Sequence, residues 1–157
     1  MDRSRLSRFV NQRLTELPLQ EPAVVSPVTS VRSAVAAMHD GSASCVFAID
    51  GGKLAGIFTE RDVLTKCMDD GFDWDQPLNA GVLTANPRTI GANRTIAEAI
   101  MFMQQQQVRT LPVMDNGSVV GLVRIGDLLR HLAEEYPEDV LNLPPRPHQV
   151  MERREGG

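Results

Sequence analysis

Two seven-residue stretches, GIFTERD at 56–62 and GLVRIGD at 121–127, decide how this chain is organised. Both begin with a glycine and two apolar residues, both end with an aspartate, and they lie 65 residues apart. They differ most informatively at the fourth position, where Thr59 in the first stretch is replaced by Arg124 in the second. A motif that recurs in this way indicates an internal repeat.

The similarity extends well beyond the motif. When the sequence is shifted by 65 residues, residues 22–66 align with residues 87–131 without a gap. The identical positions are Pro22/Pro87, Ala34/Ala99, Met38/Met103, Asp50/Asp115, Gly52/Gly117, Gly56/Gly121, Asp62/Asp127 and Leu64/Leu129. Most of the apolar positions between them also match in character. We infer that the chain contains two copies of one structural unit.

Each copy has the same order of secondary-structure signals: an extended piece, a helix, two strands joined by an Asp-Gly or Asn-Gly turn, and a second helix. Ser30 and Thr95 are suitable N-caps for the first helix of each copy. The extended pieces are 23–26 and 88–91, and the first strands are 45–50 and 110–115. The turns at 50–53 and 115–118 lead to the second strands, 54–58 and 119–123, and the last helices are 61–68 and 126–134. This order predicts an α+β fold of two β-α-β-β-α units. Each unit is too small to bury its apolar surfaces alone, so we expect the two to pack together.

The domain organisation follows from the repeat. We assign an N-terminal amphipathic helix to 1–17, the first repeat to 18–68, a polar linker to 69–80, the second repeat to 81–135, and a flexible C-terminal tail to 136–157. Within residues 1–17 the helical pattern covers 3–17. In the linker, Trp74 is expected to fill the junction between the two copies.

Composition limits the class of protein. The chain has 157 residues, a net charge of −4, 42% apolar residues and 23% charged residues, which is ordinary for a soluble globular protein. The acidic balance makes nucleic acid an unlikely partner, because nucleic-acid-binding proteins usually present a basic face. We find neither a secretory signal nor an apolar run long enough to span a membrane, so we expect a cytoplasmic protein without a membrane partner. The two cysteines lack zinc-site spacing, and Cys45 reads as a core residue.

The motif of the first copy can bind a nucleotide on chemical grounds. Thr59 falls near the start of a helix, where backbone N–H groups and the helix dipole favour an anion such as phosphate. Arg61 adds positive charge, and the Asp62 carboxylate can accept hydrogen bonds from the 2′,3′-diol of a ribose. A purely structural interpretation stands beside this one: Thr59 caps the helix and Asp62 stabilises its first turn. Spacing alone does not decide between them.

The sequence resembles the CBS-domain family. The residues that carry the resemblance are GIFTERDVL (56–64), GLVRIGDLL (121–129), VRTLPVMDNGSVVG (108–121), LTANPRTIGANRTIAEAI (83–100) and EPAVVSPVTSVRSAV (21–35). It covers about residues 18–135. It implies a tandem pair, called a Bateman module, whose two repeats pack about a pseudo-twofold axis. Family members commonly bind AMP, ADP, ATP or S-adenosylmethionine between the repeats, often form dimers, and regulate an attached or separate protein.

The resemblance also implies which residues hold the ligand. In the family motif, Gly56, Thr59 and Asp62 occupy the glycine, hydroxyl and carboxylate positions of the first site. The second copy keeps Asp127 but has Arg124 at the hydroxyl position. This departure leaves open a weak second site, an empty one, or one adapted to more phosphate charge.

By position in the family, the ligand base lies against Val25 and Cys45 in the first copy and against Ile90 and Pro112 in the second. The resemblance requires no cofactor for activity. An adenosine nucleotide or S-adenosylmethionine is implied as a regulatory ligand, together with a homodimer and a regulated partner protein.

A catalytic constellation is not recognisable in the sequence. His39, His131 and His148 are scattered, and the glycines form neither a Walker loop nor a dinucleotide fingerprint. We therefore expect a stand-alone regulatory module that senses an adenosine ligand, and not an enzyme. Two alternatives stay open: a ligand-free structural interaction and dimerisation module, and a nucleic-acid binder that uses the arginines of residues 3–13.

Overall fold

A computed structural model describes residues 3–137 of the chain. The first repeat consists of β1 (Ala23–Val25), α2 (Val31–Asp40), β2 (Cys45–Asp50), β3 (Lys53–Thr59) and α3 (Glu60–Lys66). The second repeat consists of β5 (Ile90–Gly91), α4 (Ile96–Gln106), β6 (Thr110–Asp115), β7 (Ser118–Arg124) and α5 (Ile125–Glu135). The segments that precede the repeats contain α1 (Arg3–Val10), β4 (Thr84–Ala85) and two single 3-10 turns, Leu14–Glu16 and Leu78–Ala80. The α+β fold with two β-α-β-β-α repeats is therefore confirmed.

The repeats form two sheets with equivalent pairing. The strand orders are β1-β2-β3-β4 and β5-β6-β7. In each sheet the first strand runs parallel to its neighbour, and the next two strands form an antiparallel hairpin. The hairpin turns contain the predicted positive-φ residues Gly51, Gly52, Asn116 and Gly117. Glycine and asparagine adopt this conformation at low cost, which explains why these turns form.

The helices α2 and α4 begin at the predicted caps. The Ser30 side chain accepts a hydrogen bond from the Ser33 N–H, and the Thr95 side chain accepts one from the Glu98 N–H. Glu98 also accepts the Thr95 N–H at 2.8 Å, which completes a capping box in the second repeat. Each such cap stabilises a helix by about 1 kcal/mol.

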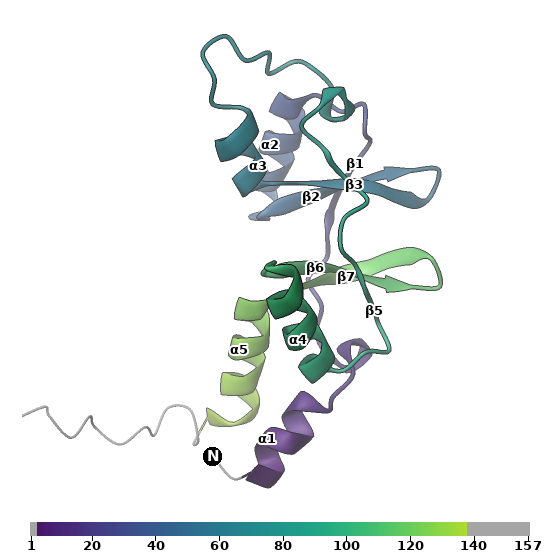
Figure 1. Ribbon diagram of the computed structural model, residues 1–157, viewed down its shortest axis with the longest axis vertical. Coiled ribbons are helices and arrows are strands. Elements are labelled where there is room, and N and C mark those ends of the chain that lie inside the picture. The colour runs from purple at the N-terminus through teal and green to yellow at the C-terminus, as the bar shows by residue number, and fades with distance from the viewer. Residues whose placement is uncertain (1–2, 138–157) are drawn as a thin grey trace, which may run out of the picture.

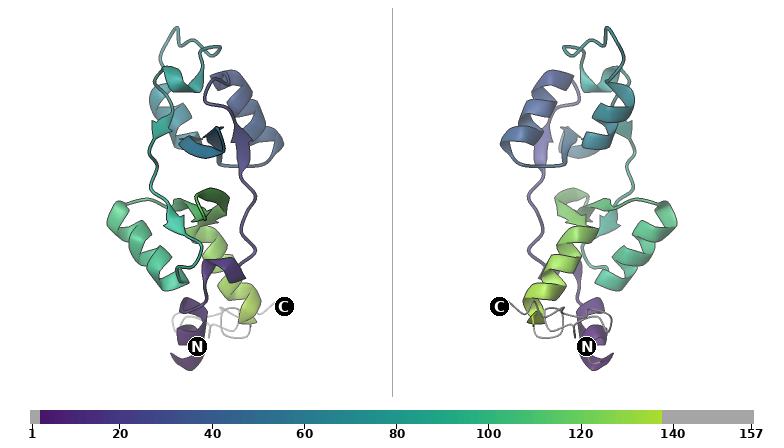
Figure 2. Two further views of the ribbon diagram at one scale, coloured as in Figure 1. Left: turned by 90° about the vertical axis from the view of Figure 1, so that its right-hand side faces the viewer. Right: turned by 90° about the vertical axis from the view of Figure 1, so that its left-hand side faces the viewer.

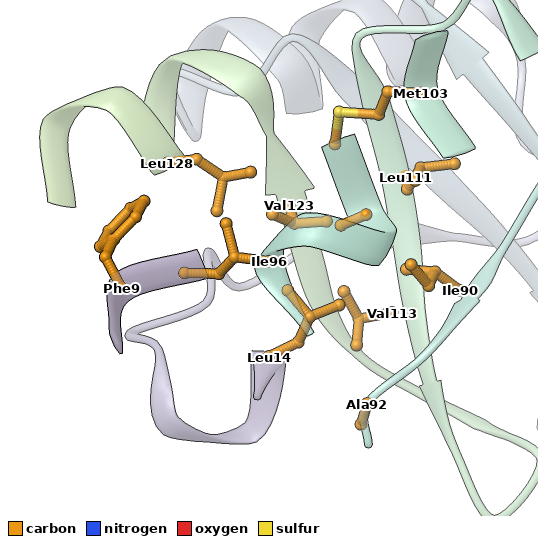
Figure 3. Packing of buried hydrophobic residues seen from close by; sticks show 11 residues of the cluster. Phe9, Leu14, Ile90, Ala92, Ile96, Met103, Leu111, Val113, Val123 and Leu128 are labelled. Atoms are coloured by element: carbon orange, nitrogen blue, oxygen red, sulfur yellow. The ribbon is translucent and has the colours of Figure 1, made fainter. Parts of the chain in front are cut away.

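The core has three parts. The two sheets face each other, and α2 with α3 and α4 with α5 lie on the outer sides (Figure 1). The helix-facing core of the first repeat includes Val31, Ala34, Met38, Val46, Phe58, Cys67, Leu78 and Val82. That of the second includes Phe9, Leu14, Ile96, Ala99, Met103, Leu111, Val113, Val123 and Leu128 (Figure 3). Between the sheets lie Cys45, Phe47 and Leu122, with Ile49, Leu54, Ile57 and Val119 packed against them.

Each repeat is completed by the segment that precedes the other repeat. Leu14 donates its N–H to the Arg94 carbonyl at 2.9 Å, and Leu78 donates its N–H to the Thr29 carbonyl at the same distance. Both leucines are fully buried. The two connecting segments therefore run in opposite directions along the two sides of the molecule (Figure 2).

This exchange corrects two sequence-based expectations. The N-terminal helix does not extend over 3–17, because α1 ends at Val10 and the following backbone bonds to the second repeat. Trp74 does not fill the junction between the repeats. It packs with Phe72, at a ring-centroid distance of 5.2 Å, against the core of the first repeat. The expected tail at 136–157 lies outside the described residues from residue 138 onward.

The glycine of the motif allows these segments to pass close to the sheet. A Cβ atom on Gly56 would lie 2.6 Å from the Thr84 carbonyl oxygen, and one on Gly121 would lie 2.6 Å from the Leu19 Cβ. Real Cβ atoms essentially never come so close to other atoms. The repeated glycine is therefore explained by the crossing of the chain over each sheet, by residues 82–84 over the first and by residues 19–20 over the second; each is called the crossing segment of its sheet. Within residues 3–137, no helix combines the length and the apolar character needed to cross a membrane.

Candidate functional site

A cavity of about 730 Å³ lies between the two repeats, beside the first copy of the motif. Its lining residues come from both repeats and from the crossing segment: Ser44, Cys45, Ile57, Thr59, Glu60, Arg61, Asp62, Thr84, Gln107, Val108, Arg109 and Thr110. The end of β3 and the start of α3 provide one wall, and the loop between α4 and β6 provides another. This volume is in the range of small-molecule sites in proteins.

Asp62 is the buried charged group of this cavity, with 8% of its surface exposed. Its Oδ2 accepts hydrogen bonds from the N–H of Thr59 at 2.9 Å and from the hydroxyl of the same residue at 3.0 Å. Its Oδ1 accepts from the Lys66 ammonium at 2.8 Å and from the Thr84 hydroxyl at 3.4 Å. A carboxylate offers about four acceptor positions, so these donors occupy all of them.

The start of α3 is largely satisfied by the protein itself. Glu60 donates its N–H to the Ser44 carbonyl at 3.0 Å, and Asp62 donates its N–H to the Thr59 hydroxyl at 3.2 Å. Thr59 and Asp62 thus form a complete capping box. Thr59 and Asp62 therefore have a structural role at this helix start, and an anion bound here depends mainly on side-chain cations.

Lys66 connects the carboxylate to the crossing segment. Besides its ion pair with Asp62, its ammonium group donates to the Val82 carbonyl at 2.9 Å and lies 3.3 Å from the Thr84 hydroxyl. The side chain is 35% exposed. The ammonium group therefore holds Asp62 to the segment that carries Val82 and Thr84.

The polar part of the cavity wall contains charged groups of both signs. Arg61 from the first repeat and Arg109 from the second are both exposed, and Glu60 lies beside them. The pKa of the Cys45 thiol is raised to about 11, mainly by burial, while nearby Arg124 lowers it and Glu60 raises it. Cys45 is therefore a neutral thiol at physiological pH and provides an apolar patch in the wall.

The second copy of the motif has a different structure. Arg124 donates from Nε to Asp127 Oδ2 at 3.0 Å and from Nη2 to Oδ1 at 3.1 Å. This hydrogen bond raises the pKa of Arg124. The cavity that Asp127 lines, beside Leu19 and Leu122, holds only about 30 Å³.

Four of the residues assigned from the sequence line the larger cavity: Cys45, Thr59, Arg61 and Asp62. The others lie elsewhere. Gly56 is buried beneath the crossing segment, and Val25 packs against the core of the first repeat. Ile90 belongs to the core of the second repeat, and Pro112 is fully buried. Arg124 and Asp127 form the separate pair described above.

Sequence reasoning missed the contribution of the opposite repeat. Thr84 and the loop 107–110 line the cavity although they lie far from the first motif in the sequence. A pseudo-twofold arrangement would have placed the loop 107–110 beside its counterpart 42–45, since the repeats are offset by 65 residues. Among residues 3–137, no group of three or more His, Cys, Asp or Glu side chains could hold a metal ion.

Comparison with known proteins agrees with this architecture. The CBS domain family model matches residues 14–69 and 80–134. YhcV from Bacillus subtilis (strain 168), a CBS domain-containing protein, is 29% identical over 110 residues, which are 68% of this chain and 75% of YhcV. Three other matching relatives are longer, and the chain spans only 15%, 34% and 19% of them. The similarity to those three concerns only a part of each protein.

Solved structures show the same fold. A CBS-domain containing protein from Agrobacterium tumefaciens has a TM-score of 0.66 and 26% identity, and the alignment covers 76% of this chain and 95% of that one. A CBS domain protein from Pyrobaculum aerophilum, solved in complex with AMP, has a TM-score of 0.67 and 20% identity, with coverage of 78% and 99%. The second likeness concerns the fold alone.

Proposed function

Because this chain belongs to the CBS domain family, we propose that it is a regulatory module that binds an adenosine nucleotide between its two repeats and so modulates a partner protein. The observation that carries the proposal is the cavity of about 730 Å³, which both repeats line and into which the motif residues Thr59, Arg61 and Asp62 face. The Pyrobaculum protein, which shares this fold, was solved in complex with AMP, and AMP is therefore the ligand class to test first.

In the proposed complex, Asp62 binds the ribose. Its four acceptor positions are occupied in the structure, so a 2′,3′-diol has to replace existing donors. The Lys66 ammonium is the donor that can leave most readily, because it is 35% exposed and its stem is flexible. Binding therefore exchanges an internal ion pair for hydrogen bonds to the sugar, and the released ammonium stays near the ligand.

The phosphate groups lie between Arg61 and Arg109, which approach the cavity from opposite repeats. Guanidinium groups bind phosphate through paired charge-assisted hydrogen bonds. The base packs on the apolar part of the wall, where Ile57, Cys45 and Val108 lie. A ligand held in this way contacts both repeats and favours the arrangement of the repeats to which it binds more tightly. That change of population is the signal the module passes to its partner.

The test is calorimetric titration of AMP, ADP and ATP into the wild-type chain and three variants. Asp62→Asn keeps the shape of the side chain and is expected to weaken binding at least tenfold, because the amide offers one acceptor atom where the carboxylate offers two. Arg109→Ala is expected to weaken ATP more than AMP, since more phosphate charge is left uncompensated. Asp127→Asn is the matched control, at the equivalent position of the other repeat, and should leave the affinity unchanged.

Asp62 is also part of the capping box, so circular dichroism must show that each variant is folded. Equal affinity of wild type and a folded Asp62→Asn variant would remove the assignment of Asp62. Absence of binding by every nucleotide would favour the second candidate, a ligand-free interaction and dimerisation module. One observation speaks for that candidate: the Asp62 carboxylate is fully satisfied without a ligand.

As part of the same proposal, the chain forms a homodimer through the outer faces of α3 and α5. Leu64 and Leu129 occupy equivalent positions on these helices and are 69% and 62% exposed. Apolar side chains related by the internal symmetry suit a second copy related by a twofold axis. Light scattering should show a dimer for the wild type and a monomer for Leu64→Glu with Leu129→Glu. Val28→Glu, at a residue that is also 69% exposed but lies outside these helices, should stay dimeric.

A further inference from the structure

The second repeat has lost the side chains that surround Asp62 in the first. At the equivalent positions, Arg124 replaces Thr59, His131 replaces Lys66, and Leu19 replaces Thr84. Gly126 stands where the first repeat has Arg61, so the cation beside the cavity is missing as well. The aspartate is retained, but the groups that would accompany a nucleotide around it are not.

Arg124 donates hydrogen bonds to both carboxylate oxygens of the retained aspartate. Its Nε and Nη2 donate to the two carboxylate oxygens of Asp127 at 3.0 and 3.1 Å. The two side chains are 26% and 22% exposed, so the pair is partly shielded from solvent. Paired hydrogen bonds between guanidinium and carboxylate are among the strongest in proteins. A ribose diol would offer Asp127 the same two hydrogen bonds without the charge.

The space between Asp127 and the segment 17–19 is small. The cavity that Asp127 lines there, together with Leu19 and Leu122, holds about 30 Å³. A space of 30 Å³ accommodates water but not a nucleotide. Leu19 lies against the sheet there, because the Cβ position of Gly121 is within 2.6 Å of the Leu19 Cβ.

We propose that the Arg124 side chain occupies the position beside Asp127 where a second nucleotide would bind, which we call the second cleft. Each chain therefore binds one nucleotide and not two. The inference rests on the proposed function in that its ligand is the nucleotide of the first cleft. Arg124 satisfies Asp127 permanently, as the diol would satisfy Asp62 in the complex. In the competing role, Arg124 binds ligand phosphate through its roughly three remaining N–H donors while Asp127 already neutralises its charge, which weakens the attraction for the phosphate.

Binding stoichiometry tests the proposal directly. Equilibrium dialysis with labelled AMP, at a concentration just sufficient to saturate the wild type, is expected to give one AMP per wild-type chain, one per Asp127→Asn chain, and clearly less than one per Asp62→Asn chain. Two AMP per wild-type chain would overturn the proposal. Loss of binding in Asp127→Asn with retention in Asp62→Asn would overturn it too, because the second cleft would then be the working site.

A second measurement does not depend on any ligand. Thermal unfolding of Arg124→Ala, Asp127→Ala and the double variant forms a cycle that isolates the pair. Each single change is expected to lower Tm by about 2–4 °C, and the double variant should lose clearly less than the sum of the two. Additive losses would show that Arg124 does not hold Asp127, and would overturn the proposal. If no nucleotide binds the wild type, the proposed function fails, and this cycle still decides whether Arg124 occupies the cleft.

Discussion

In the first repeat the aspartate of the motif lines a cavity of about 730 Å³, whereas in the second repeat both oxygens of the equivalent aspartate are bound by Arg124. The backbone around the two sites is nevertheless the same: Cys45 lies opposite Thr59, and Thr110 lies opposite Arg124. The difference teaches that residues required by the path of the backbone, such as the motif glycines, are the same in both copies. Side chains that face the cleft have diverged.

The largest expected effect tests whether the two motif glycines are needed for the close passage of the chain over each sheet. Gly56→Ala and Gly121→Ala should each lower the free energy of unfolding by about 2–3 kcal/mol, because the added methyl group overlaps the crossing segment. Urea denaturation measures this loss. Gly126→Ala is the control: a Cβ there meets nothing within 4 Å, and alanine favours helix, so stability should stay equal or rise by up to about 1 kcal/mol. A loss at only one of the two motif glycines would break the symmetry between the repeats.

The next effect concerns pH and separates Cys45 from its counterpart Thr110, which does not titrate. Burial raises the Cys45 pKa from 9.0 to about 11, so the folded state holds this proton more tightly than the unfolded state does. The resulting stability is complete below pH 9 and is lost as the pH rises towards 11, by up to about 3 kcal/mol. The wild type should therefore lose more stability over this range than Cys45→Ala. Parallel pH profiles for the two proteins would contradict the assignment of Cys45 as a buried thiol.

The smallest effect compares the helix caps. Ser30→Ala and Thr95→Ala should each cost about 1 kcal/mol. The loss should be larger at Thr95, because its hydroxyl also donates to the charged Glu98 carboxylate at 3.3 Å, whereas the Ser30 hydroxyl donates to the neutral Ser33 hydroxyl. Chemical denaturation resolves the difference, with Glu98→Ala as the variant that should make the two caps alike. A larger loss at Ser30 would contradict this ranking.

Much of the fold could be predicted from the sequence because it depends on local signals. The gapless offset of 65 residues, the turn residues Asn116 and Gly117, and the caps Ser30 and Thr95 each report on their own neighbourhood. The strands 45–50 and 110–115 appear where the pattern indicated them. Contacts between segments distant in sequence were not accessible in this way, which is why the end of α1 and the position of Trp74 were predicted wrongly.

The site was predicted only as far as the motif extends. Thr59 and Asp62 were identified from their own stretch, but Thr84 and Arg109 approach the cavity through tertiary packing. The pairing of Arg124 with Asp127 is also a local event, three residues apart on one helical turn. Sequence spacing allowed it but could not choose between an ion pair and a cation that is free to bind phosphate.

The exchange of segments across the module means that the repeat in the sequence is not the unit that folds. A fragment cut at the family boundaries, 14–69, would contain the strands and helices of the first repeat but not Leu78 or Val82, which close its core. During synthesis, the first repeat must therefore wait until the chain beyond residue 82 has left the ribosome, and the second recruits Leu14, made long before it. The two repeats are expected to melt as one cooperative body, and an isolated copy should remain unfolded.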